Sequence, residues 1–146
     1  MYKHILVPTD GSPLSLKAVR AASKLAAKLK AKITALYVIA PYMPRTTSED
    51  IVYHGAYSMR EYEAEMRKTA DKALARVVAA ANGSSCDTMA KTHLHPWEAI
   101  IDAAKSRKCD LIVMASHGRR GIAGLLLGSE TQKVLTHSKT PVLVCR

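Results

Sequence analysis

The sequence predicts an α/β fold, a single doubly wound sheet of five parallel strands in the order 3-2-1-4-5 with helices on both faces. Strand-like and helix-like stretches alternate along the whole chain, as in βαβ units. The strand interiors are apolar without regular polar alternation, which is typical of parallel sheets covered on both faces. At 146 residues the chain has the length of one domain, spanning residues 1–146. The strand order is an assumption about the fold, because connectivity alone does not fix it.

The N-terminal half begins with two predicted strands around one helix. Residues 4–7 form a short apolar run that a turn containing proline and glycine ends at once. Ser12 is a favourable N-cap and Pro13 suits the first helical position, so we expect a helix over residues 13–30. Residues 33–39 are rich in β-branched and apolar side chains, and they are the second predicted strand.

A long loop is expected over residues 41–56, where the periodicity disappears and prolines accompany a polar patch. A loop of this length inside a compact domain is usually functional or mobile. A helix with an alanine-rich side and a charged side follows over residues 57–81, and Asn82-Gly83 is a suitable stop signal for it.

The C-terminal half continues the alternation of strands and helices. A third strand is expected over residues 86–93, and a proline opens a helix over residues 96–108. The dense apolar run at 111–114 predicts the fourth strand. A helix over residues 129–137 and a strand over residues 141–145 complete the chain.

Cysteine usage and hydropathy indicate the compartment. No apolar run is long enough to span a membrane and the N-terminus has no signal-peptide pattern, so we expect a cytoplasmic protein with no membrane partner. Cys86, Cys109 and Cys145 are odd in number and widely separated. They predict buried, reduced thiols rather than a disulfide framework or a CxxC metal site.

The formal charge of +10 by itself allows nucleic acid, an anionic membrane surface or a phosphorylated small molecule as partner. Part of this charge follows one face of the first helix, at Lys17, Arg20, Lys24 and Lys28, opposite an apolar face. A solvated helix surface explains that pattern. No aromatic platform lies among the basic residues, so nucleic acid is not the expected partner, and a nucleic-acid hypothesis rests on the charge alone.

A glycine-rich loop between the fourth strand and the helix that starts at Ser129 is the most distinctive part of the sequence, with glycines at 118, 121, 124 and 128. Unpaired N–H groups and the helix dipole at such a helix start favour an anion, so the loop is a candidate phosphate cradle. In the assumed strand order, residues 8–12 face this loop across the crevice where ligands bind. Residues 129–132 also have the pattern of a capping box, in which the Ser129 hydroxyl serves the helix instead.

Several motifs resemble those of the universal stress protein family, and together they cover nearly the whole chain. They are Val7-Pro8-Thr9-Asp10-Gly11-Ser12, Ser116-His117-Gly118, the nine-residue spacing from Gly118 to Gly128-Ser129, and the final Thr140-Pro141-Val142-Leu143-Val144. The nucleotide-binding branch of that family is marked by Gly, two residues, Gly, nine residues, Gly, and then Ser or Thr. This chain fits that pattern except at its first glycine, where it has Ala115.

The alanine at position 115 has two interpretations. If the position requires a left-handed conformation, alanine costs about 1 to 2 kcal/mol, enough to weaken a site about tenfold or more. If Ala115 is simply the last extended residue of the strand, the cost is almost nothing. Its place directly after Met114 favours the second interpretation.

The resemblance implies a bound ATP with Mg²⁺, and a homodimer formed through the last strand. It implies phosphates at the glycines, at Ser129 and at the amide of Glu130, ribose near Ala115, and adenine against Val38. Asp10 is implied to lie near the nucleoside or, through ATP, its metal. The predicted nucleotide-binding residues are Pro8, Thr9, Asp10, Val38, Met114, Ala115, Gly118, Arg119, Arg120, Gly128, Ser129 and Glu130.

Several of these residues also have a plain structural interpretation. Asp10 would equally serve its own Asp-Gly turn, and Arg119 and Arg120 are either phosphate ligands or solvated loop charges. His93 and His95 lack the further ligands of a metal site, and they are expected to be an unliganded pair. His117 adjoins the cradle but has no evident catalytic partner.

The function expected from this set is an ATP-binding switch in the stress response, with slow ATP hydrolysis at most. The sequence has no Walker A lysine motif and no kinase-type catalytic aspartate with its metal-binding asparagine, so no efficient enzyme is expected. The alternative is an interaction protein of the same fold that binds no nucleotide and works through its dimer surface and the 41–56 loop. Leu125-Leu126-Leu127 would then be a loop anchor or a dimer contact.

Overall fold

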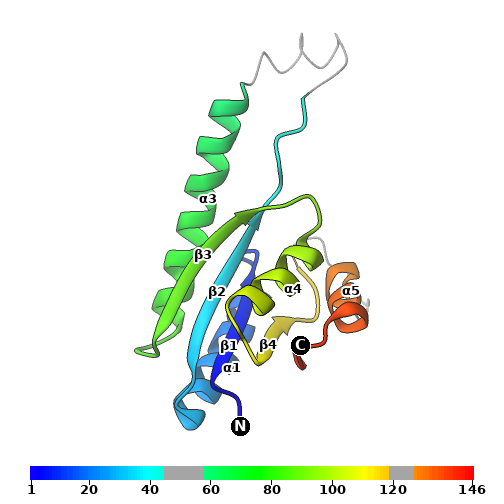
Figure 1. The fold of residues 1–146 in the computed structure, drawn as a ribbon. Helices are drawn as coiled ribbons and strands as arrows, with labels where there is room; N and C mark the ends of the chain where they lie inside the picture. Colours follow the sequence, from blue (N-terminus) through cyan, green and yellow to red (C-terminus); the bar gives the residue numbers. More distant parts are fainter. Residues whose placement is uncertain (45–57, 119–126) are drawn as a thin grey trace.

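The computed structural model describes residues 1–44, 58–118 and 127–146, and Figure 1 shows their arrangement. Its elements are β1 (His4–Thr9), α1 (Pro13–Leu29), β2 (Lys32–Ile39), α3 (Met59–Ala80), β3 (Cys86–Thr92), α4 (Pro96–Ser106), β4 (Leu111–Ala115), α5 (Ser129–His137) and β5 (Val142–Cys145). The strands form one sheet in the order β3-β2-β1-β4-β5, and every neighbouring pair is parallel. The predicted fold class and strand order are therefore confirmed.

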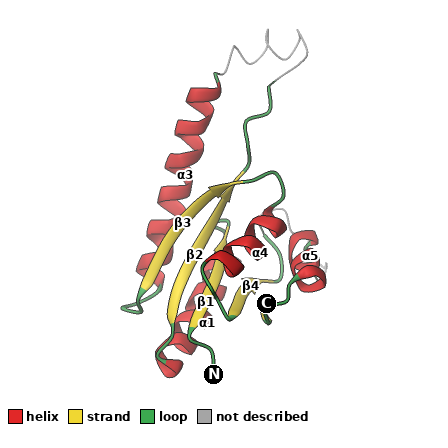
Figure 2. Ribbon diagram, in the orientation of Figure 1, coloured by secondary structure: helices red, strands yellow, loops and turns green. Residues whose placement is uncertain are grey.

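Two apolar cores lie on opposite faces of the sheet. Figure 2 shows the helices that cover the sheet. Ile5 and Val7 of β1 pack in the core beneath α1 and α3, whereas Leu6 packs in the core beneath α4 and α5. Successive side chains of a strand point to opposite faces, so a strand covered on both sides must be apolar at every position. This explains the unbroken apolar runs in the sequence.

The element ends differ from prediction at a few residues. β1 continues to Thr9, because Pro8 still pairs in register with Leu36 of β2. The register with β4 ends at Leu6, two residues before the proline, so the missing N–H of Pro8 falls beyond that ladder. α4 ends at Ser106 rather than 108, since Lys108 adopts a left-handed conformation with φ of 55°.

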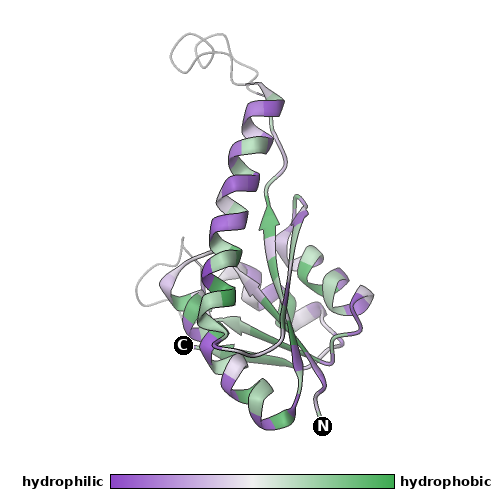
Figure 3. Ribbon diagram, turned by 90° about the vertical axis from the view of Figure 1, so that its left-hand side faces the viewer, coloured by the Kyte–Doolittle hydropathy of each residue, from purple (hydrophilic) through white to green (hydrophobic). Residues whose placement is uncertain are grey.

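The long helix α3 stands partly clear of the sheet (Figure 3). Its N-terminus is closed by a capping box between Ser58 and Glu61, and its buried side chains begin only at Ala70. Next to its first turns, the Tyr62 hydroxyl donates to the carbonyl of Ala40 at 2.9 Å, and the rings of Tyr62 and Tyr42 are in contact. Most of the predicted 41–56 loop, and residue 57 of the predicted helix, lie outside the described residues.

The three cysteines are free, but the prediction that all are buried is correct only for Cys109. Cys86 and Cys145 are half-buried because they lie in β3 and β5, the two edge strands of the sheet. Burial raises the pKa of the Cys109 thiol to about 11. Among the described residues, no helix is long and apolar enough to cross a membrane.

Candidate functional site

A pocket of about 210 Å³ opens at the carboxyl ends of β1 and β4. Its described lining comprises Pro8, Thr9, Asp10, Ser15, Leu36, Val38, Pro96, Ile100, Met114, Ala115, His117, Gly118, Glu130 and Thr131. Two motif loops and the first turn of α5 converge on this pocket, at the place where ligands bind in doubly wound sheets. A larger hollow of about 730 Å³ lies between α1 and α3, but none of the motif residues lines it, so it is not the candidate site.

The loop between β1 and α1 forms one wall and is held rigid by its own hydrogen bonds. The Ser12 amide donates to Asp10 Oδ1 at 2.9 Å, and the Gly11 amide donates to Thr9 Oγ1 at 3.1 Å. Ser12 caps α1 by accepting from the Ser15 amide at 3.1 Å. Asp10 thus makes the turn bond expected of an Asp-Gly pair, while its carboxylate also lines the pocket.

The two motif loops meet at Gly118. A Cβ atom added to this glycine would lie 2.6 Å from Asp10 Oδ2, and its φ is not in the left-handed region. Gly118 is therefore needed for space rather than for backbone freedom. Gly128 is confined in the same way, because an added Cβ would lie 3.1 Å from His117 Cα and 3.3 Å from the Ser116 carbonyl oxygen.

The N-terminus of α5 has no side-chain cap. Its N-cap is Gly128, which makes no such bond, and the first helical hydrogen bond runs from the Gln132 amide to the Gly128 carbonyl at 3.0 Å. The capping-box interpretation is therefore wrong, because Ser129 is already the first helical residue. Gly128 is fixed as the cap by its own amide, which donates to the Ser116 carbonyl at 2.7 Å. The amides of residues 129–131 precede the helical ladder, as an anion site requires.

In each of the other described helices, one amide of the first turn donates to a side chain. Ser12 caps α1 and Ser58 caps α3. The N-cap residue of α4, His95, provides no side-chain bond, but Glu130 of α5 supplies one: the Trp97 amide donates to Glu130 Oε2 at 2.9 Å. Among the helices of the described residues, α5 is thus the one whose first turn receives no side-chain acceptor.

Ala115 is the last residue of β4, paired in register with Cys145 of β5. It is not among the described residues with positive φ, so alanine brings no backbone strain here. The interpretation as the last extended residue of the strand is confirmed. The Ala115 carbonyl accepts from the buried hydroxyl of Thr131 at 3.0 Å, which ties the end of β4 to α5.

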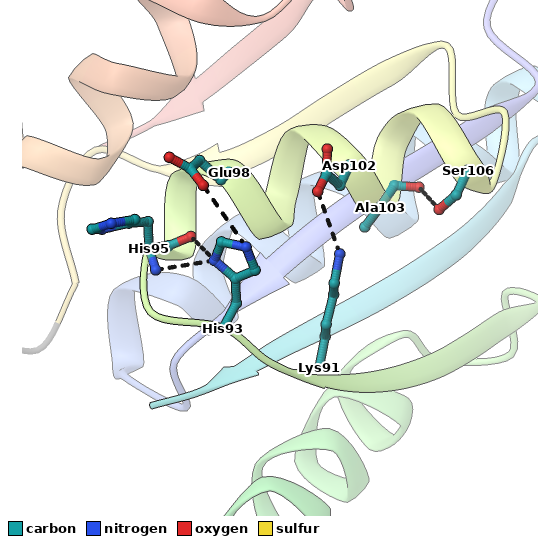
Figure 4. A network of polar contacts seen from close by, with 7 residues as sticks. All are labelled: Lys91, His93, His95, Glu98, Asp102, Ala103 and Ser106. Carbon is teal, nitrogen blue, oxygen red and sulfur yellow. Dashed lines mark hydrogen bonds and ion pairs between the residues drawn. The ribbon is translucent and has the colours of Figure 1, made fainter. Parts of the chain in front are cut away.

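The histidines near the pocket have partners within the fold. Figure 4 shows the contacts of His93 with His95 and Glu98. His93 Nδ1 accepts from the His95 amide at 3.0 Å, and His93 Nε2 lies 3.8 Å from Glu98 Oε2. The same view shows the ion pair of Lys91 and Asp102. Its Nζ and Oδ2 atoms lie 3.6 Å apart. Across the described ranges, no group of three or more His, Cys, Asp or Glu side chains could hold a metal. Nearer the pocket, His117 Nδ1 lies 3.1 Å from the hydroxyl of buried Ser116.

Most of the predicted site residues come together. Pro8, Thr9, Asp10, Val38, Met114, Ala115, Gly118 and Glu130 all line the pocket. Gly128 and Ser129 form the adjoining start of α5, whereas Arg119, Arg120 and residues 125–126 of the leucine run lie outside the described residues. The lining also includes residues that no sequence motif assigns to the site, namely Ser15, Leu36, Pro96, Ile100 and Thr131. Leu36 could have been predicted, since residues 36 and 38 share one face of a strand and Val38 was a predicted site residue.

Comparison with known proteins agrees with this geometry, because the sequence profile described as the universal stress protein family matches residues 1–146. The chain belongs to the universal stress protein family. It is 34% identical to universal stress protein YxiE of Bacillus subtilis over the full length of both chains. It is 31% identical to universal stress protein MJ0531 of Methanocaldococcus jannaschii, covering 100% of this chain and 83% of the relative.

Solved structures of this family have the same fold. Universal stress protein UspA from Lactobacillus plantarum superimposes with a TM-score of 0.82 and 28% identity, over 99% of this chain and 98% of the other. A universal stress protein solved in complex with cAMP has a TM-score of 0.68 and 29% identity, over 99% and 97% of the two chains. At least one structural neighbour thus binds an adenine nucleotide.

Proposed function

We propose that this universal stress protein binds ATP, with Mg²⁺, in the pocket between Asp10 and the start of α5. The uncapped first turn of α5 carries the proposal, because its free amides and helix dipole face a pocket lined by the nucleotide-binding motif. The cAMP complex of a relative gives independent support for an adenine nucleotide in this family.

Each wall of the pocket has a part in this proposal. The amides of Gly118, Ser129 and Glu130 bind phosphate, and the exposed Ser129 hydroxyl, which has no bond within the described residues, adds a donor. Val38, Leu36 and Met114 offer an apolar surface for the adenine ring. Asp10 is the described carboxylate nearest Gly118, and it would accept from ribose or approach the Mg²⁺ that ATP carries.

A switch is a better description than an enzyme. The described pocket offers backbone amides that bind phosphate, and its described lining contains no Lys or Arg. Transition-state stabilisation would then rest on amides and on at most one of Arg119 and Arg120, which lie outside the described residues, so slow hydrolysis at most is expected. We place this activity in the cytoplasm, as a nucleotide-dependent step of the stress response.

Calorimetry with ATP and Mg²⁺ tests the proposal directly. We expect saturable binding, and we expect the double variant Gly118→Val, Gly128→Val to lose it while circular dichroism remains that of a folded α/β protein. Absence of binding at millimolar ATP would contradict the proposal. Mass spectrometry of small molecules released on denaturation would identify a copurified nucleotide.

We also propose a homodimer formed through β5. In the described chain this edge strand pairs only with β4, and its residue Leu143 is 44% exposed. An exposed strand edge is a template for pairing with another chain. Light scattering should give twice the monomer mass for the wild type and the monomer mass for Leu143→Glu. If such a dimer forms and no nucleotide binds, the interaction-protein alternative becomes the better description.

A further inference from the structure

The side chain of Glu130 joins the two helices that flank the pocket. Glu130 is the second residue of α5 and lines the pocket. Its Oε2 atom accepts from the amide of Trp97, in the first turn of α4, at 2.9 Å. Its Oε1 atom lies 3.6 Å from Lys133 Nζ, and 38% of the Glu130 side chain is exposed. The carboxylate is therefore fixed at the edge of the pocket rather than free in solvent.

This carboxylate has an effect beyond capping α4. The start of α4 attracts negative charge, and Glu130 already satisfies it. The start of α5 remains open for phosphate, but the fixed negative charge of Glu130 lies within one side-chain length of the α5 amides. The described lining contains no Lys or Arg. Lys133 offsets part of the Glu130 charge from outside the pocket.

We propose that Glu130 sets the phosphate-charge preference of this site and makes the binding of ATP depend on a divalent cation. This inference rests on the proposed nucleotide function. Like charges a few ångströms apart repel each other, so the cost of binding rises with each uncompensated phosphate charge. Mg²⁺ removes part of the charge of ATP, so ATP enters as its Mg²⁺ complex. AMP carries less charge and binds with or without the metal.

The variant Glu130→Gln separates the charge from the cap. Glutamine keeps a side-chain oxygen that can accept from the Trp97 amide, but it has no negative charge. Glu130→Ala removes both. Glu98→Gln is the matched control, because Glu98 also lies in a first helical turn, its side chain is 40% exposed, and it is not part of the described lining.

The experiment is calorimetric titration of each protein with AMP and with ATP, in EDTA and in Mg²⁺. For Glu130→Gln we expect the affinity for metal-free ATP to rise about threefold to tenfold, an effect reduced by the partial exposure of the carboxylate, with AMP changing less than about twofold. The ratio of the ATP affinity in Mg²⁺ to the ATP affinity in EDTA should become smaller by the same factor. Glu98→Gln should bind both nucleotides with the affinities of the wild type. Thermal melts should show that Glu130→Gln and Glu98→Gln are both folded.

The possible results distinguish the two proposals. If Glu130→Gln changes AMP and ATP affinities by the same factor, or leaves the Mg²⁺ dependence unchanged, the role assigned to Glu130 is wrong. The same holds if Glu130→Gln equals the wild type while Glu130→Ala weakens both nucleotides alike, since Glu130 then acts only by holding α4. If the wild type binds neither AMP nor ATP, the nucleotide site itself is refuted.

Discussion

Replacing Gly118 with alanine should weaken nucleotide binding by displacing Asp10. The added Cβ atom would lie 2.6 Å from Asp10 Oδ2, about 1 Å short of ordinary van der Waals contact. The backbone of Gly118 is not in the left-handed region, so the substitution causes crowding without backbone strain. The carboxylate is the softer partner, and it must rotate away from the crevice.

The cost of this rotation can be worked from the contacts of Asp10. Its Oδ1 atom accepts from the Ser12 amide at 2.9 Å, and a hydrogen bond to a charged group contributes about 1.5 to 3 kcal/mol. Moving the side chain off its rotamer costs about 0.5 to 1.5 kcal/mol. Because the bond bends before it breaks, we expect Gly118→Ala to lower the free energy of unfolding by about 1 to 2 kcal/mol. A loss of this size at the ligand corresponds to about tenfold weaker binding.

Urea denaturation and calorimetry with ATP and Mg²⁺ would measure the two effects. Gly83→Ala is the matched control, since Gly83 has φ of +85° and nothing lies within 4 Å of its added Cβ. That control should lose about 1 to 2 kcal/mol of stability through backbone strain and keep its nucleotide affinity. If Gly118→Ala binds ATP within about twofold of the wild type, the contact between the two loops does not position Asp10 for the ligand.

Three further predictions concern the surroundings of the pocket. Thr131→Val leaves the buried Ala115 carbonyl without its 3.0 Å donor, so it should cost about 1 to 3 kcal/mol in urea denaturation, whereas Thr136→Val, at an exposed hydroxyl, should cost less. Ala115→Gly restores the family glycine, but it should lower the free energy of unfolding by about 0.5 to 1 kcal/mol. It should not raise the nucleotide affinity, because the strand needs no glycine there. A clear increase in affinity measured by calorimetry would contradict this. Burial, and then the charge of Lys32, lower the pKa of His4 below 6.5. The folded state therefore favours the neutral form of His4. The contribution of this preference to the free energy of unfolding is complete above pH 6.5, and it is lost as the pH falls through the lower pKa that His4 has in the folded state. His4→Gln should flatten the decline in melting temperature between about pH 7 and 5, and an unchanged slope would assign that decline to other groups.

The positions of the helices and strands were predictable because their signals are local. Apolar runs mark the strands, Ser12 and Pro13 start α1, and the order of strands follows from the fold class once the alternation is recognised. The ends were less predictable where pairing decides them. Pro8 looks like a strand breaker in the sequence, yet its register with β2 keeps it in β1.

The pocket was predictable as far as the motif reaches and no further. The glycines at 118 and 128 were identified, but their reason, the closeness of Asp10 and of the 116–117 backbone, depends on contacts between distant segments. The prediction of a capping box at Ser129 was wrong, because the Gly128 amide donates to the Ser116 carbonyl and Gly128 is itself the N-cap. The bond from Trp97 to Glu130 spans 33 positions, so no local pattern predicts it.

The partly free-standing helix α3 implies that different parts of this chain open at different rates. Its turns before Ala70 bury no side chain, and their contacts include the Ser58 capping box, the exposed pair of Arg67 and Asp71, and the contacts of Tyr62 with Ala40 and Tyr42. Such interactions contribute little, so these turns can unfold and refold while the sheet stays intact. Amide hydrogen exchange in the first turns of α3 should therefore be governed by local fraying, and exchange in β1 by global unfolding.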